Sequence, residues 1–387
     1  MSEIVEHSGG LPEQIIMDEI LVRLPVKSLC RFKSVSKLWY AVISSAQFAK
    51  SHLKKNSNFN SRKVFFQYEG DSRLLYYEAY DEIEDHKDPR GLFSLGKMVN
   101  DAQLNGFADA DVFGSSCGLV CLSAQQGQIY LYNPILQQSQ MIDAPEPFDV
   151  KEDILLRGFG YVSSIDDFKL VLGLKGHVGY PMLYVYSLKN NDWRLIESGD
   201  YQFDVLATSK VDSCNGILVN ERLHWWTTPV GTNNNGRIFA FDLLHEMFDE
   251  VPIPETLSSK VSYMFNSLES SGLCTMEGCL CLSIIWEDHN VEIWMLKEYG
   301  DTDSWIRLYN LRFMSCYKYI CASFFGCTKN GKFLISCWNK SRYNFFFLVD
   351  PNHQYYPKFN HVGHFWGGTS TIVDYVESLV SLRGSVT

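Results

Sequence analysis

The pattern of hydrophobic and polar positions divides the chain into a short helical part and a long β-rich part. Between Leu11 and Ser45 apolar residues recur every three or four positions, which is the spacing of one helix face. Pro12 fits a first helical turn, and Pro25 ends the first helix. From Lys63 onward apolar and aromatic residues come in short runs separated by polar turns, a pattern typical of β-strands.

The helical part predicts three helices with more apolar surface than they can bury among themselves. Their apolar stripes hold Ile16, Ile20 and Leu24, then Val26, Leu29, Phe32 and Val35, then Leu38, Trp39, Val42 and Ile43. Domains of fewer than about 40 residues usually need outside help to stay folded. We therefore expect something else to cover part of this surface: a partner protein or, if the helices form a cap, the domain that follows. Residues 46–55 could add one or two further helical turns.

The β-rich part contains a repeat of about 54 residues. Strand-like runs end at this spacing at Asn133, Ser187, Asp242, Leu296 and Asp350, and one step back reaches Ala79. A large aromatic residue follows six positions later in three runs, at Trp193, Phe248 and Tyr356. A second recurrent strand is opened by Gly118, Asn215-Gly216, Gly278 or Asn330-Gly331. Such a period, with three or four strands per unit, is the size of a propeller blade.

The predicted fold is mainly β. It has a three-helix N-terminal domain over residues 8–55, a linker over 56–62, and one large propeller over 63–383 with six blades of four strands. KVFFQY and RLLYYEAY, separated by Glu69-Gly70-Asp71, read as a hairpin. Thr371 to Leu382 alternates like a strand, and we expect it to pair with the N-terminal blade, because an open ring would expose a sheet edge. Two stacked sandwiches with accidental spacing are the alternative.

Charge separates the two parts of the chain. Residues 1–57 carry 8 Lys and Arg against 5 Asp and Glu, whereas the remainder carries 26 against 40. An acidic β-rich part argues against nucleic acid, whose phosphates need a basic footprint. It is compatible with a basic partner protein, or simply with solubility.

The expected cellular compartment is inferred from the lack of a signal peptide and of a membrane-spanning segment in the sequence. Residues 1–10 lack the basic start and apolar run of a signal peptide, and no window approaches about 18 uninterrupted apolar residues. We expect a soluble protein of the cytoplasm, the nucleus or both, with no membrane partner. The 11 cysteines fit buried thiols better than a disulfide framework, and without any CxxC pair a zinc site is not expected.

The helical part resembles the F-box of plant proteins. The residues that carry the resemblance are LP at 11–12, IL at 20–21, LPVKSL at 24–29, RFK at 31–33, VSK at 35–37 and Trp39. It implies docking onto the SKP-type adaptor of a cullin-RING ubiquitin ligase. The adaptor-binding residues that it implies are Leu11, Pro12, Ile16, Ile20, Leu24, Pro25, Leu29 and Trp39, some of which must also hold the helices together.

The β-rich part is similar to the F-box-associated domain of the same proteins, which is related to kelch-type propellers. The similarity lies in GFGYVSSIDDFKLV (158–171), VYSLKNNDWRLI (185–196), VNERLHWWT (219–227), IFAFDLLHEMFDEVPIPE (238–255) and VEIWMLKEYGDTDSWIRLYNL (291–311). Family members include S-locus F-box proteins and F-box proteins that control immune-receptor levels. The strict kelch double-glycine signature is missing here.

Together the two resemblances imply the substrate-recognition subunit of an SKP-cullin-F-box ubiquitin ligase, which is not itself catalytic. Client-binding residues are unknown; inter-blade loops on one face are expected to hold the client, with candidates at 69–73, 81–90, 143–153 and 231–237. Two alternatives stay open. One is a glycan-binding or galactose-oxidase-like propeller with a helical extension, and the other is a scaffold that binds the adaptor without promoting degradation.

Candidate catalytic groups are few. His224 lies on a predicted strand with no Ser or Cys motif near it, and a packed histidine is the better interpretation. Asp166-Asp167 reads as a solvated turn, and Gly367-Gly368 lacks phosphate-loop spacing. Trp193, Trp225, Trp226, Trp294 and Trp305 could form a glycan platform, although such side chains usually fill the space between blades. We find no nucleophile, metal set or cofactor loop.

Overall fold

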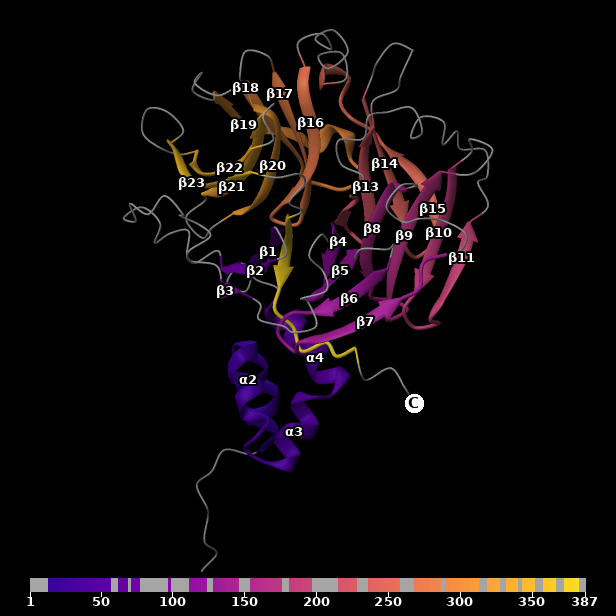
Figure 1. The fold of residues 1–387 in the computed structure, drawn as a ribbon, viewed down its shortest axis with the longest axis vertical. Helices are drawn as coiled ribbons and strands as arrows, with labels where there is room; N and C mark the ends of the chain where they lie inside the picture. The colour runs from indigo at the N-terminus through magenta and orange to yellow at the C-terminus, as the bar shows by residue number, and fades with distance from the viewer. Residues whose placement is uncertain are drawn as a thin grey trace, which may run out of the picture.

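The computed structural model describes residues 13–56, 62–68, 71–76, 97–98, 111–123, 128–145, 154–175, 181–196, 215–227, 236–257, 268–286, 290–312, 319–327, 332–339, 343–351, 358–366 and 372–382. A small helical domain lies at one end of a ring of β-sheets (Figure 1). The prediction of a mainly β chain with N-terminal helices is confirmed.

The helical domain contains a broken first helix and three regular ones. They are α1 (Glu13–Ile15), the π-helical η1 (Ile16–Ile20), the 3-10 helix η2 (Leu21–Arg23), α2 (Val26–Phe32), α3 (Lys37–Ile43) and α4 (Ala46–Asn56). Leu24 is extended, as the residue before a proline usually is, so Pro25 does end the first helical segment. With 11 residues, α4 is longer than the one or two turns expected from the sequence. None of the helices in the described ranges is long and apolar enough to cross a membrane.

Six antiparallel sheets of four strands each form the blades, as predicted. Blade 1 is β24 (Ile372–Val376), β1 (Arg62–Tyr68), β2 (Asp71–Tyr76) and β3 (Lys97–Met98); blade 2 is β4 (Asp111–Ser116), β5 (Leu119–Ser123), β6 (Ile129–Asn133) and β7 (Gln138–Ile142); blade 3 is β8 (Ile154–Val162), β9 (Asp167–Lys175), β10 (Pro181–Ser187) and β11 (Asp192–Ile196). Blade 4 is β12 (Ile217–Val219), β13 (Arg222–Thr227), β14 (Arg237–Asp242) and β15 (Met247–Val251); blade 5 is β16 (Leu268–Met276), β17 (Cys279–Trp286), β18 (Asn290–Leu296) and β19 (Trp305–Arg312); blade 6 is β20 (Tyr319–Cys327), β21 (Phe333–Asn339), β22 (Tyr343–Asp350) and β23 (Lys358–Trp366). A 3-10 turn, η8 (Thr302–Ser304), precedes β19.

The C-terminal strand closes the ring. β24 pairs antiparallel with β1, from Arg62 opposite Val376 to Phe66 opposite Ile372. β24 also contacts β4 and β20, the first strands of the two neighbouring blades. The prediction that the last segment pairs with the N-terminal blade is confirmed for 372–376, and so is the β1–β2 hairpin, in which Tyr68 lies opposite Asp71.

The repeat of about 54 residues marks one structural position, the end of the third strand in blades 2 to 6. Its members Asn133, Ser187, Asp242, Leu296 and Asp350 are the last residues of β6, β10, β14, β18 and β22. Asn133 Oδ1 accepts the N–H groups of Ile135 and Leu136, at 3.0 and 3.1 Å, and Asp242 Oδ1 does the same for Leu244 and His245. At these two positions the side-chain oxygen satisfies the backbone of the following turn, whereas Leu296 of blade 5 has no such oxygen. Ala79 and Tyr356 lie outside the described residues.

One part of the repeat alignment is wrong. Asn215-Gly216 does not open the second strand of blade 4 but precedes its first strand, β12. The tight turn is at Asn220-Glu221, with φ of 50° and 59°, matching Cys117-Gly118 and Glu277-Gly278 in blades 2 and 5. Gly216 is needed for a different reason: a Cβ there would come within 2.6 Å of the Trp225 ring. Asn330-Gly331 lies outside the described residues.

The antiparallel order gives the propeller two different ends. The turns from first to second strand and from third to fourth strand lie at one end, and we call it the helix end because the helical domain packs there (Figure 1). The connections from second to third strand, and from each blade to the next, join strands at the opposite end, which we call the loop end. Apolar clusters fill the space between blades; one joins Leu156 and Val171 of blade 3 to Leu223, Trp225 and Phe241 of blade 4.

Candidate functional site

Side-chain oxygens fix where the helices of the N-terminal domain begin. Ser36 Oγ accepts the backbone N–H of Trp39 at 3.1 Å and caps α3. Ser45 Oγ accepts the N–H of Phe48 at 3.2 Å just before α4. Serine at a helix start satisfies donors that have no partner within the helix. These caps fix where α3 and α4 begin.

The helical domain has its own small core. Leu21, Val22, Val26, Leu29, Ile43, Phe48 and Ala49 are each at most 7% exposed and belong to one apolar cluster. The Phe32 and Trp39 rings pack edge to face, with centroids 5.7 Å apart, and both are half-buried at the side of this cluster. These contacts join α2 and α3 and fix which residues are left facing solvent.

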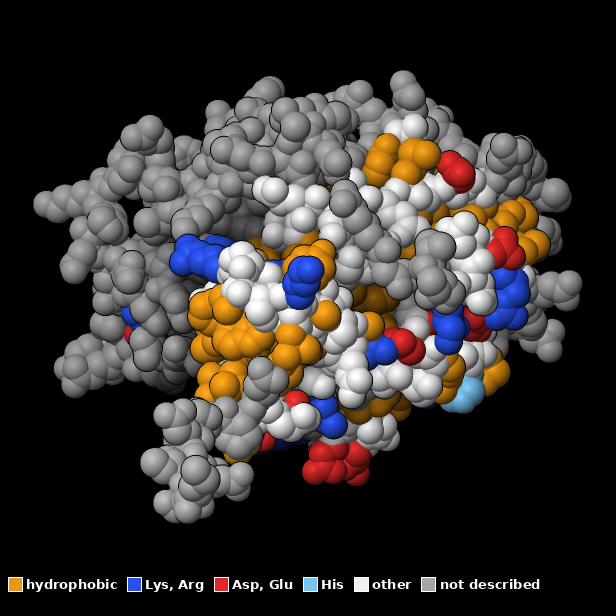
Figure 2. Space-filling view, turned by 90° about the horizontal axis from the view of Figure 1, so that it is seen from below, with side chains coloured by type: hydrophobic (Ala, Val, Ile, Leu, Met, Phe, Trp, Pro, Cys, Tyr) orange, Lys and Arg blue, Asp and Glu red, His pale blue; other side chains and the backbone are white. Residues whose placement is uncertain are grey.

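Apolar residues that the core does not use remain on the surface. Ile15, Ile20, Val35, Leu38 and Tyr40 are 41–60% exposed. Viewed from the helix end, apolar side chains gather in this part of the molecule beside basic ones (Figure 2). Exposing apolar side chains to water is unfavourable, and polar residues could stand at these positions in a domain that binds nothing. We therefore regard these five residues as the candidate docking patch.

The structure divides the adaptor-binding residues expected from the sequence into three groups. Ile20 and Pro25 are exposed, whereas Ile16, Leu24 and Trp39 are half-buried against the core. Leu29 is 0% exposed and lies wholly within the core. Leu11 and Pro12 lie outside the described residues. Of the expected residues that the structure describes, the patch as defined includes Ile20, and Leu29 supports it from the core.

Four exposed apolar residues were not on the expected list, namely Ile15, Val35, Leu38 and Tyr40. Val35 and Leu38 were visible in the sequence as members of the apolar stripes. Helical spacing alone does not say which members of a stripe face the core, because the angle between two short helices rotates each stripe.

His52 of α4 is buried and neutral. It is 2% exposed, and its Nε2 is 2.8 Å from the carbonyl oxygen of Leu24, to which it donates as Nε2–H. Its Nδ1 is buried without a hydrogen-bond partner. Burial lowers the pKa of His52, since a charged imidazole would lose its hydration. His52 thus ties α4 to the segment just before Pro25.

The candidate catalytic histidine, His224, is also a packed residue. It is 0% exposed in blade 4, with Nδ1 3.0 Å from the Ile217 carbonyl and Nε2 2.6 Å from the Tyr299 hydroxyl. Burial lowers the pKa of His224 to about 4. The neutral ring fits both contacts, with Nδ1–H donating and Nε2 accepting from Tyr299. This confirms the packed interpretation.

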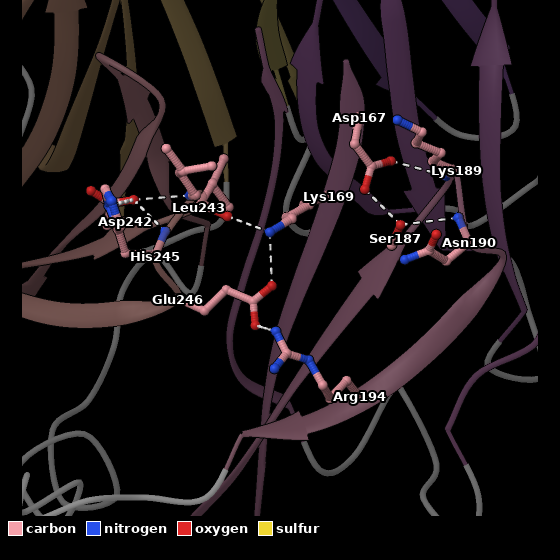
Figure 3. A network of polar contacts seen from close by, with 11 residues as sticks. Asp167, Lys169, Ser187, Lys189, Asn190, Arg194, Asp242, Leu243, His245 and Glu246 are labelled. Carbon is pink, nitrogen blue, oxygen red and sulfur yellow. Dashed lines mark hydrogen bonds and ion pairs between the residues drawn. The ribbon is translucent and has the colours of Figure 1, made fainter. Parts of the chain in front are cut away.

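Asp166 and Asp167 differ in their surroundings, so the prediction of one solvated turn holds only for the first. Asp166 is exposed and pairs with Lys50 of α4 at 2.5 Å, and this hydrogen bond lowers the pKa of the Asp166 carboxyl. Asp167 is 4% exposed and accepts hydrogen bonds from Ser187 Oγ and the Lys189 N–H (Figure 3). A buried carboxylate needs such partners.

A group of polar contacts joins blades 3 and 4. Lys169 Nζ donates to Glu246 at 2.7 Å and to the carbonyl oxygen of Leu243 at 2.6 Å, while Arg194 pairs with the other oxygen of Glu246 (Figure 3). Lys169 and Glu246 are buried and paired with each other, while Arg194 reaches Glu246 from the surface, and these contacts fix how the two blades sit against each other.

The tryptophans mostly fill space between strands. Trp225 and Trp305 are 2% and 6% exposed, Trp226 and Trp294 are partly buried against the cluster between blades 4 and 5, and Trp193 packs against the cluster between blades 2 and 3. Within the described ranges, no three His, Cys, Asp or Glu side chains gather in a way that could hold a metal ion.

The candidate client loops fall mostly at the loop end. The segments 69–73, 143–153 and 231–237 join strands there, whereas 81–90 starts from the helix end of β2. Most residues of these segments lie outside the described ranges. The described strands that flank three of the four segments have the relevant ends at the loop end.

Comparison with known proteins agrees with this architecture. Residues 11–51 match the F-box domain model, and residues 96–382 match the F-box associated beta propeller domain model. An F-box/kelch-repeat protein of Arabidopsis thaliana is 28% identical over 312 residues, covering 76% of this chain and 78% of the relative. The F-box protein CPR1 of the same plant is 27% identical, covering 77% and 72%.

Solved structures add a weak likeness to other propellers. The beta-propeller domain of Cps50 (Swd1) from Myceliophteria thermophila aligns with a TM-score of 0.34 at 8% identity, covering 65% of this chain and 69% of that domain. The fold assignment therefore rests on the six closed sheets and on the family models. By these matches, which span most of its length, the chain belongs to the family of F-box proteins that carry an F-box associated β-propeller domain.

Proposed function

We propose that this protein is the substrate-recognition subunit of an SKP-cullin-F-box ubiquitin ligase. Membership of the F-box family with a propeller supports a recognition role in ubiquitin ligases in general. The observation that carries the finer proposal is the candidate docking patch, in which five large apolar residues of the short helical domain are 41–60% exposed. The adaptor binds this patch, and cullin and RING subunits follow through the adaptor.

In this proposal the adaptor and the client bind at opposite ends of the propeller. The helical domain occupies the helix end, so a client protein would bind at the loop end, where three of the four candidate loops start. The protein itself performs no bond chemistry in this scheme. It raises the local concentration of the client beside a ubiquitin-charged enzyme. The excess of acidic residues outside 1–57 favours a basic client.

The adaptor proposal predicts that Leu38→Asp weakens adaptor binding at least tenfold, equivalent to about 1.4 kcal/mol. Leu38 is 46% exposed in the patch, so a charge there opposes docking without disturbing the core. Leu195→Asp is the matched control, because Leu195 on β11 has the same 46% exposure but lies outside the patch. Titration calorimetry with a purified SKP-type adaptor measures both. Equal affinities for both variants and the wild type would contradict the proposal.

The same variant can be used to identify the client protein. With the proteasome blocked, the full chain carrying Leu38→Asp should retain the client and lose the adaptor, whereas the wild type recovers both. Proteins enriched on both baits are client candidates, and their ubiquitylation in a reconstituted reaction should require the wild-type chain. If such clients bind but are never ubiquitylated, the non-degradative scaffold is the better description. The glycan-binding alternative loses support, because Trp226, Trp294 and Trp305 pack into the apolar cluster between blades 4 and 5.

A further inference from the structure

The last residues of the described chain lie between the propeller and the helical domain. Beyond β24, residues 377–382 leave the sheet, and Ser378 and Leu379 are only 0% and 3% exposed. Leu379 belongs to the same apolar cluster as Leu21, Leu29 and Phe48 of the helices, with Val380 packed beside it. We call residues 377–382 the tail. The core of the N-terminal domain is thus completed from the opposite end of the sequence.

Blade 2 holds the tail in place. The buried Asn133 donates from Nδ2 to the carbonyl oxygens of Ser378, at 3.2 Å, and Val380, at 2.7 Å. Gln138 Oε1 accepts Ser381 Oγ at 2.9 Å and the Leu382 N–H at 3.1 Å. Backbone carbonyls and amides satisfied in this way fix the path of the tail, and hence the position of Leu379.

The tail also depends on closure of the ring. Val376, opposite Arg62 of β1, is the last residue of β24, and Leu379 enters the helical core only three positions later. Gly118 permits the close passage between them, because a Cβ there would come within 2.2 Å of Ser378 Oγ and 2.8 Å of the Val376 carbonyl oxygen. Pairing of β24 with β1 therefore places the start of the tail, and the hydrogen bonds from blade 2 hold the rest of it, so that Leu379 reaches the helices.

We infer that ring closure and completion of the helical domain are coupled through the tail, so that the docking patch is fully ordered only on a closed propeller. The helices are synthesised first, but they gain Leu379 last. The coupling makes adaptor binding conditional on a finished propeller, which would keep incomplete chains out of the ligase. This consequence for adaptor binding rests on the proposed function. The coupling between ring closure and the helical core does not, because it involves no other protein.

The test is hydrogen exchange of backbone amides, which needs no adaptor. Leu379→Ala should speed exchange in α2 and α4 roughly tenfold or more, since it removes a buried side chain from their core, while β14 to β19 keep their protection. A second variant avoids the risk of general unfolding. Asn133→Asp retains the oxygen that caps the β6–β7 turn but loses both donations to the tail, and it should also speed exchange in α2 and α4.

Asp242→Asn is the matched control, since Asp242 caps the equivalent turn of blade 4 and does not touch the tail. It should leave the helices unchanged. Unchanged helix exchange in Leu379→Ala and Asn133→Asp, or equal acceleration in Asp242→Asn, overturns the inference; if Leu379→Ala unfolds the whole chain, the Asn133→Asp result decides. Adaptor affinity is measured separately. A wild type that fails to bind the adaptor would overturn the proposed function and leave the exchange result standing.

Discussion

Replacing Leu29 with Asp is expected to unfold the helical domain while the propeller stays folded. Leu29 is 0% exposed in the core shared by the helices and the tail. Truncating a buried leucine costs about 2–5 kcal/mol, and a buried unpaired carboxylate adds several more. A helical domain of this size has no such margin. Adaptor binding should therefore be lost because the patch loses its support.

Hydrogen exchange and binding together distinguish this loss from the effect of Leu38→Asp. In Leu29→Asp the amides of α2, α3 and α4 should exchange freely, whereas in Leu38→Asp they should stay protected although binding is weakened. Leu29→Met is the conservative control, because a volume-conserving change in a core usually costs less than about 1.5 kcal/mol. Protected helices in Leu29→Asp would show that Leu29 does not hold this core.

Acid is expected to destabilise the propeller through His224. Burial lowers the pKa of His224 to about 4, against about 6.5 for the hydrated side chain. Between these two pH values His224 is protonated in the unfolded chain but neutral in the folded one. The contribution of His224 to the free energy of unfolding is therefore fully present above pH 6.5 and is lost as the pH drops toward 4. The shift corresponds to a loss of about 3 kcal/mol.

The measurement is the free energy of unfolding in urea at several pH values between 7 and 4, for the wild type and for His224→Phe. Carboxylates titrate in both proteins, so the difference between them isolates the histidine. The wild type should lose about 3 kcal/mol more than the variant over this range. Parallel curves for the two proteins would show that His224 accepts a proton in place. Some acid sensitivity should persist in the variant, because burial also lowers the pKa of His52 in the helical domain.

Local chemistry explains why much of the fold could be predicted. The 54-residue spacing was readable because strand-like runs end at the same place in successive blades, where Asn133 and Asp242 carry oxygens that cap equivalent turns. Pro25 ended the first helix because it has no N–H to donate and its ring forces Leu24 into an extended conformation. The alignment failed at Asn215-Gly216, because that glycine serves close packing against Trp225 instead of a turn. A sequence shows that a small residue is present but not which neighbour requires it.

The sequence by itself determined the class of fold, the six-blade repeat and the existence of an apolar helical domain, since each is written in the periodicity and turn chemistry of the chain; the closing strand followed from the need to leave no open sheet edge. The tertiary structure alone decided which apolar residues face outward. It buried Leu29, exposed Leu38, and filled the remaining gap with Leu379 from the far end of the chain. Burial depends on the angles between helices and on contacts between distant segments, and no local pattern encodes these.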